Sequence, residues 1–147
     1  MEWTKDDFTI TTEKEKIDVN YVHDFLTHSY WAEAIPIETV RRSIEGSICF
    51  SVFYLERQVG FARVITDEAT FAYLADVFID EKFRGKGLSK WLMDCLVNLP
   101  SLQGLRRFIL ATRDAHGLYR QFGFLPLNNV DRWMHIHHPD VYKKQKE

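Results

Sequence analysis

The chain has 147 residues, of which 46% are hydrophobic, 14% aromatic and 27% charged. This length favours one domain over residues 1–147, with a core over about residues 8–138, and the apolar content is too high for a disordered chain. Nineteen Lys and Arg against 21 Asp and Glu give a formal net charge of −2. This near-neutral balance gives no electrostatic footprint for non-specific nucleic-acid or anionic-membrane binding, and it leaves open only a local basic patch from Arg106, Arg107 and Arg113.

Nothing in the sequence indicates export or membrane insertion. The first residues lack a basic segment followed by an apolar run, and no stretch reaches the about 18 consecutive apolar residues of a membrane span. The two cysteines, Cys49 and Cys95, each lie in an apolar stretch. They are too few for a disulfide framework or a cysteine zinc site, which predicts buried free thiols in a reducing cytoplasm.

Hydrophobic periodicity predicts a mixed α/β domain with the element order β-α-α-β-β-β-α-β-α-β. Alternating β-branched runs predict strands, and apolar residues at helical spacing predict helices. The predicted strands cover residues 8–12, 48–55, 59–66, 72–79, 107–111 and 124–137. The predicted helices cover residues 17–26, 37–44, 88–99 and 114–122, and residues 143–147 are expected to fray. This order favours a layered architecture around one central sheet.

The segment from residue 74 to residue 89 carries the clearest chemical signal. A strand over 74–79 leads into Arg84-Gly85-Lys86-Gly87-Leu88-Ser89, and a helix follows. Glycine permits a positive φ and a close backbone approach, and the free N–H groups in the first turn of a helix bind anions. Arg84 and Lys86 add positive charge at the same place. Two glycines that alternate with two cations favour a phosphate site over a solvated basic turn.

Two common phosphate motifs do not fit this segment. A P-loop, G-x-x-x-x-G-K-[ST], requires glycine where Asp80 stands and a hydroxyl residue where Gly87 stands. The dinucleotide motif G-x-G-x-x-G requires glycine at position 90, which is Lys90.

The segment resembles motif A of the GCN5-related N-acetyltransferase (GNAT) superfamily, [QR]-x-x-G-x-[GA]. Arg84 takes the first position and Gly87 the glycine, while Ser89 stands where the family usually has glycine or alanine. The Ser89 hydroxyl either crowds a pyrophosphate or donates a hydrogen bond to it. Residues 74–79 resemble the fourth strand of the family, and residues 118–124 resemble its late helix with the ending [YF]-x-x-x-G-F. The order of elements is similar over essentially the whole chain.

This resemblance implies a central mixed, mostly antiparallel sheet flanked by helices, with acetyl-CoA held where the fourth and fifth strands diverge. The pyrophosphate is expected on the amides of residues 84–89, and the pantetheine arm on the backbone of residues 77–79. The implied chemistry is direct attack of an acceptor amine on the thioester, without a covalent enzyme intermediate. The expected cofactor-binding residues are Val77, Phe78, Ile79, Arg84, Gly85, Lys86, Gly87, Leu88, Ser89 and Phe122.

Two residues are candidates for proton transfer. By the resemblance, Tyr119 approaches the sulfur of CoA and protonates the departing thiolate; the alternative is an aromatic ring packed against Phe122 or Phe124. Asp76 is an acid within an apolar strand, a setting in which enzymes tune carboxylates as general bases. The resemblance implies that Asp76 deprotonates the acceptor, directly or through water. An outward-facing edge position and an ion pair with Arg63 are the alternatives.

Acceptor contacts are predicted from Tyr30 and Trp31, in the loop where this family usually shapes its acceptor pocket. Their rings can stack on a substrate or hold a cation, although core packing is equally compatible with Trp31. Arg63 is a candidate contact for an acidic acceptor, with a surface ion pair as the alternative.

His135 and His137 share one face of the predicted last strand. No further ligand types accompany them, so no metal site is expected.

The sequence therefore predicts an acetyl-CoA-dependent N-acetyltransferase that acetylates a primary amine of a small molecule or peptide. Two alternatives stay open: a non-catalytic acyl-CoA-binding regulatory module, and an unrelated nucleotide-binding α/β domain. No nucleic-acid or membrane partner is expected. Exposed aromatic residues allow a homodimer without requiring one.

Overall fold

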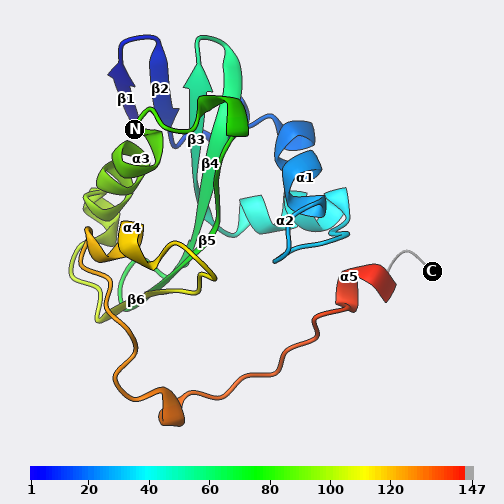
Figure 1. The fold of residues 1–147 in the computed structure, drawn as a ribbon, viewed down its shortest axis with the longest axis vertical. Coiled ribbons are helices and arrows are strands. Elements are labelled where there is room, and N and C mark those ends of the chain that lie inside the picture. Colours follow the sequence, from blue (N-terminus) through cyan, green and yellow to red (C-terminus); the bar gives the residue numbers. More distant parts are fainter. Residues whose placement is uncertain (145–147) are drawn as a thin grey trace.

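The computed structural model describes residues 1–144, so residues 145–147 of the predicted frayed end lie outside the described residues. The strands are β1 (Glu2–Lys5), β2 (Phe8–Thr11), β3 (Ile48–Tyr54), β4 (Arg57–Thr66), β5 (Phe71–Ile79) and β6 (Arg107–Leu110). They form one sheet in the order β1-β2-β3-β4-β5-β6 (Figure 1). Neighbouring strands are antiparallel except β5 and β6, which are parallel.

Helices cover both faces of this sheet (Figure 1). One face carries α1 (Val19–Thr27) and α2 (Ile37–Glu45), and the other carries α3 (Leu88–Val97) and α4 (His116–Arg120). Each face has its own apolar core. The predicted mixed, mostly antiparallel sheet flanked by helices is thus confirmed. The remaining elements are the 3-10 helices Lys14–Lys16, Glu81–Phe83, Pro100–Leu102 and Val130–Arg132, and the short helix α5 (Val141–Lys144).

Local chemistry explains how the helices nearest the site begin. Asp18 caps α1, because its side chain accepts a hydrogen bond from the Tyr21 amide at 3.1 Å. α3 begins differently: its N-cap is Gly87, in the left-handed conformation and without any side-chain cap. The α3 residues that are buried against the sheet recur at helical spacing and are Leu88, Leu92, Met93, Cys95 and Leu96.

The strands β5 and β6 separate halfway along β5. Their pairing runs from Phe71 opposite Arg107 to Leu74 opposite Leu110, after which β5 continues to Ile79 beside β4 alone. A β-bulge lies at the point of separation, because β5 carries one more residue than β4 between the pairs Phe61–Phe78 and Arg63–Ala75. Asp76 sits in this bulge with a φ of +55°. A bulge bends the strand that carries it, and the pairing of β5 with β6 ends just before this one.

The structure differs from the sequence prediction at both ends of the chain. The strand β1 was not predicted; it pairs with β2, with Trp3 opposite Ile10. The prediction of a last strand over residues 124–137 was wrong, since this segment forms no strand and follows an extended path away from the sheet (Figure 1). Alternation shows that a segment suits a strand, but a strand also needs a partner edge. Of the residues expected to fray, 143 and 144 belong to the short helix α5.

No helix among residues 1–144 combines the length and the apolar character needed to cross a bilayer.

Candidate active site

The glycine turn (residues 84–89) connects the end of β5 to α3. Gly85 and Gly87 have φ values of +82° and +78°, and a Cβ added to either would meet no atom within 4 Å. Glycine is therefore required by the backbone conformation and not by crowding. Within residues 1–144 the amides of residues 85–90 have no hydrogen-bond acceptor, and the first helical bond joins Trp91 N to Gly87 O at 3.1 Å. A row of free donors thus lies at the positive end of α3.

Two cations and a hydroxyl accompany these donors. The Arg84 Nε donates to the Ile79 carbonyl at 3.1 Å, which fastens the glycine turn to the end of β5. Lys86 is exposed between the two glycines, and Ser89 is half-buried in the first turn of α3. Free amides, a helix N-terminus and cationic side chains together form a site for a phosphate or pyrophosphate group.

A pocket of about 530 Å³ lies where β5 and β6 separate. Its walls are residues 73–77 of β5, residues 110–115 after β6, the loop residues Tyr30 and Trp31, and Tyr119 of α4. The pocket therefore brings together five of the residues that the sequence singled out, from three separate parts of the chain: Tyr30, Trp31, Asp76, Val77 and Tyr119. It also contains Arg113, whose guanidinium lies 3.9 Å from the centre of the Tyr30 ring. No pattern in the sequence indicates this cation–π contact.

Tyr119 is mostly enclosed, with 8% of its surface exposed. Its ring packs edge-on against Phe124, with centroids 6.0 Å apart. Burial raises the pKa of the Tyr119 phenol above its ordinary value, and Tyr30 and Asp114 raise it further. The phenol is therefore protonated at neutral pH, the state that a proton donor needs.

The Asp76 cluster consists of Asp76, Arg63 and Trp31. Arg63 Nε donates to Asp76 Oδ2 at 2.8 Å, and Trp31 Nε1 donates to Asp76 Oδ1 at 2.9 Å. Arg63 also donates to Ser47 Oγ at 3.1 Å. The side chains of Arg63 and Asp76 are only 15% and 9% exposed, so the pair is mostly buried and is not the surface ion pair considered from the sequence. Of the alternatives for Asp76, the structure shows the ion pair with Arg63.

Comparison with known proteins decides the family. The profile of the Acetyltransferase (GNAT) family matches residues 2–124. The chain belongs to the GNAT acetyltransferase family. It is therefore an acyltransferase, and the alternative of an unrelated nucleotide-binding domain is excluded.

Individual relatives agree with this assignment. The Gibberella zeae protein FG08082, provisionally named an acetyltransferase, is 29% identical over 140 residues, which span 80% of this chain and 78% of that protein. The crystal structure of xcc2953, a GNAT-family protein from Xanthomonas campestris pv. campestris, superposes with a TM-score of 0.90 at 47% identity and covers 92% of this chain and 96% of that chain. A GNAT acetyltransferase from Elizabethkingia anophelis with acetyl-CoA bound shares the fold, with a TM-score of 0.64, 15% identity and coverage of 91% and 90%.

The predicted cofactor-binding side chains of this GNAT protein do not all face one space. The Phe78 ring stacks on Phe25 with centroids 3.8 Å apart, on the α1 side of the sheet. Ile79 and Leu88 are buried in the core beneath α3. Only the backbone of these three residues is therefore placed to contact a ligand. Val77 and Phe122 are half-buried at the edge of the same core.

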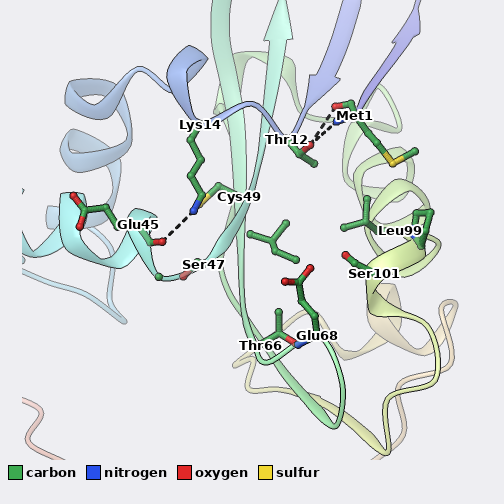
Figure 2. Close-up of a pocket in the computed structure, with 13 residues that line it drawn as sticks. Met1, Thr12, Lys14, Glu45, Ser47, Cys49, Thr66, Glu68, Leu99 and Ser101 are labelled. Atoms are coloured by element: carbon green, nitrogen blue, oxygen red, sulfur yellow. Dashed lines mark hydrogen bonds between the residues drawn. The ribbon is translucent and has the colours of Figure 1, made fainter.

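Two further hollows adjoin the GNAT core. A groove of about 860 Å³ follows β6 and α4 and includes Tyr119, Phe122 and Val130. A pocket of about 590 Å³ lies between the ends of β3 and α3, where Lys14 donates to the Glu45 carbonyl (Figure 2). This second hollow contains none of the predicted site residues.

Among residues 1–144 no group of three or more metal-ligand side chains occurs. His135 and His137 only stack on each other, with ring centroids 5.6 Å apart.

Proposed function

We propose that this GNAT protein transfers an acetyl group from acetyl-CoA to a primary amine of a small molecule or peptide. The observation that carries the proposal is the unpartnered row of amides in the glycine turn, with Arg84 and Lys86 beside it. A pyrophosphate fits such a row, because each free N–H gains an acceptor and the helix dipole favours the negative charge. Binding of acetyl-CoA by the Elizabethkingia anophelis relative supports the choice of cofactor.

The pantetheine arm extends in this proposal along β5 beyond Leu74, where the backbone has no strand partner on its β6 side. The acetyl group then enters the pocket between β5 and β6, and the acceptor enters past Tyr30 and Trp31. The amine nitrogen attacks the thioester carbonyl carbon, a C–N bond forms and the C–S bond breaks. The departing thiolate takes its proton from the Tyr119 phenol.

The proton released by the acceptor amine goes to Asp76 through a water molecule in this proposal. Both carboxylate oxygens of Asp76 already accept one hydrogen bond, yet each oxygen has a second lone pair. Arg63 and Trp31 would therefore hold the carboxylate in place while it accepts the proton.

The cysteines fit a protein that acts in the reducing cytoplasm. The thiols of Cys49 and Cys95 are free and buried, and burial raises the pKa of each to about 11.

A thermal-shift titration with acetyl-CoA tests cofactor binding, with CoA, ATP and NADH as comparators. A ligand at about 100 times its Kd stabilises the folded state by about 2.7 kcal/mol, a shift of several degrees at this size. Stabilisation by acetyl-CoA and CoA but not by ATP or NADH is expected. No shift with either CoA species would overturn the cofactor assignment.

An amine panel then tests turnover, with release of the CoA thiol as the signal. Thiol release that requires both acetyl-CoA and a primary amine is expected. Stabilisation by acetyl-CoA without thiol release on any amine would instead indicate the non-catalytic CoA-binding module.

A further inference from the structure

Two neighbouring residues of opposite charge, Arg113 and Asp114, line the pocket between β5 and β6. They lie in the loop that joins β6 to α4, and both side chains are exposed. Within residues 1–144 neither of them forms an ion pair or a side-chain hydrogen bond, with the other or with a third residue. One wall of the pocket therefore presents a positive and a negative charge that the described chain leaves unpaired.

A chain of contacts holds the Arg113 guanidinium in place. It lies 3.9 Å from the centre of the Tyr30 ring. The Tyr30 ring packs edge-on against Trp31, with centroids 5.1 Å apart, and Trp31 Nε1 donates to Asp76 Oδ1 at 2.9 Å. Two aromatic rings thus connect this cation to the carboxylate that is proposed to accept the proton. A guanidinium already held against a ring loses less conformational freedom when it binds a ligand than a mobile surface arginine does.

The contact with Tyr30 does not consume the hydrogen-bond donors of Arg113. A cation above an aromatic ring is attracted by the negative charge of the ring face, and its N–H groups stay available to other acceptors. The five N–H donors of arginine form a planar fork that matches the two oxygens of a carboxylate. Arg113 can therefore stay on Tyr30 and bind a carboxylate at the same time.

Asp114 lies near the reacting end of the pocket. Burial raises the pKa of the Tyr119 phenol most, and the charges of Tyr30 and Asp114 raise it further. Because such a charge effect fades with distance, the Asp114 carboxylate lies close to the group that is proposed to protonate the thiolate. An ammonium group that enters the pocket is attracted to this carboxylate. A second positive charge on the same acceptor would instead meet Arg113 and be repelled.

We propose that the acceptor is a zwitterionic amine, an amino acid whose carboxylate binds Arg113 while its ammonium group is drawn to Asp114. This inference rests on the proposed function, because it names the acceptor class of the same pocket. The amine loses its proton and attacks the thioester as described above, and Arg113 holds the carboxylate throughout. A pocket of about 530 Å³ suits a small acceptor of this kind. A polyamine lacks the carboxylate and adds positive charge, so it should be a poor acceptor.

Matched pairs of acceptors test the proposal. Tyrosine and tyramine, like leucine and isoamylamine, differ only by the carboxylate, and release of the CoA thiol gives kcat/KM for each. The carboxylated member should be favoured by about 10-fold or more, the size of one hydrogen bond to a charged group. Arg113→Gln should lower this ratio to about one, and Arg113→Glu should make tyramine the better substrate. Turnover of all four amines without preference for a carboxylate would overturn the inference and leave the proposed function intact.

The matched control is Arg106→Gln. Arg106 is an exposed arginine just before β6, and it lines none of the three hollows described above. The substitution removes the same charge outside the pocket, so the preference for the carboxylated acceptor should stay as in the wild type. An equal loss of preference in Arg106→Gln and Arg113→Gln would point to net charge and would contradict a carboxylate site at Arg113.

Binding measurements separate the acceptor from the cofactor, because an unpaired arginine also suits a phosphate of CoA. The Kd for CoA should be the same in the wild type and in Arg113→Gln, and a weaker Kd in the variant would overturn the proposal. Calorimetry on the CoA-loaded chain then measures acceptor binding without turnover. Tyrosine should bind the wild type about 10-fold or more tightly than Arg113→Gln. Equal binding to both would also overturn the inference, whereas a chain that binds no CoA at all would overturn the proposed function.

Discussion

The glycine turn and the Asp76 cluster both adjoin the second half of β5, yet their polar groups are in opposite states. In the glycine turn the backbone amides of residues 85–90 have no acceptor within residues 1–144, and the surface is exposed. In the Asp76 cluster each carboxylate oxygen has a donor, and the ion pair is buried. Unpaired donors are available to a ligand, whereas a satisfied buried pair first of all supports the fold. Substitutions in the two regions should therefore affect different measurements.

The largest expected effect is on stability and comes from Asp76→Ala. Removing one partner of a buried ion pair leaves the other charge uncompensated, so the free energy of unfolding should fall by about 3–5 kcal/mol. Urea unfolding measures this change. The control is Glu38→Ala, which breaks the exposed pair with Arg41 at 3.3 Å and should cost less than about 1 kcal/mol. Equal losses in the two variants would show that the Asp76 cluster does not support the fold in this way.

The next effect is on turnover and comes from Tyr119→Phe. Removing a general acid typically costs about 10²-fold or more in kcat, while the Kd for acetyl-CoA should stay unchanged because the glycine turn is intact. Steady-state kinetics and a binding titration measure the two quantities. Because burial raises the pKa of Tyr119, kcat of the wild-type enzyme should show no loss of this acid between about pH 7 and about pH 9. Wild-type turnover in the variant would remove Tyr119 from the mechanism.

A smaller effect, on cofactor affinity, is expected from Gly87→Ala. An alanine in the left-handed conformation costs about 1–2 kcal/mol, and the turn relieves this strain by moving its amides. The Kd for acetyl-CoA should rise by about 10-fold, which corresponds to about 1.4 kcal/mol. The matched control is Gly104→Ala, since Gly104 has the same φ of +78° and equally open surroundings. Gly104→Ala should lose as much stability as Gly87→Ala but leave the Kd for acetyl-CoA unchanged. If the Kd rose in both variants, the effect of Gly87→Ala would come from strain alone.

The smallest expected effect is on the pH dependence of stability and comes from Asp67, an exposed carboxylate that accepts several hydrogen bonds. It accepts hydrogen bonds from Thr70 N, Thr70 Oγ1 and Ala69 N at 2.8, 2.7 and 2.9 Å, and these lower its pKa well below the ordinary value. Because the pKa of Asp67 is lower in the folded state, its ionised form stabilises the fold at pH values above the unfolded-state pKa of about 3.9. This stabilisation is lost as the pH falls below that value. The stability difference between the wild type and Asp67→Asn should therefore shrink as the pH is lowered from about 5 to about 2. Chemical unfolding at each pH measures it; a constant difference would refute the linkage.

The glycine turn was predictable from the sequence because its requirement is local. Positive φ at two positions and free amides at a helix start demand glycine at fixed offsets, and Gly85 and Gly87 stand there. Most strands and helices were predictable from hydrophobic periodicity for the same reason, whereas the mixed, mostly antiparallel arrangement of the sheet was predicted from the family resemblance. The roles assigned to Tyr119 and Asp76 stay predictions.

Features that depend on a distant partner were not predictable. The strand β1 contains only four residues, two of them charged, and its existence depends on pairing with β2. Residues 124–137 alternate like a strand, but within the described chain they pair with no strand of the sheet. The sequence offered the ion pair of Arg63 and Asp76 only as one alternative, because the pair depends on the β4–β5 register, which no pattern within either strand specifies.

The bulge at Asp76 also changes which side chains of β5 face which helices. Before the bulge the even-numbered residues Ala72 and Leu74 face the core beneath α3, as alternation requires. After it the odd-numbered Val77 and Ile79 face that core, and Phe78 faces α1 and α2. The alternation of side chains along β5 thus shifts by one residue at the bulge. Deleting that residue would restore unbroken alternation and leave Phe78 facing α1 and Ile79 facing the core beneath α3, whereas straightening β5 without a deletion would exchange these two faces.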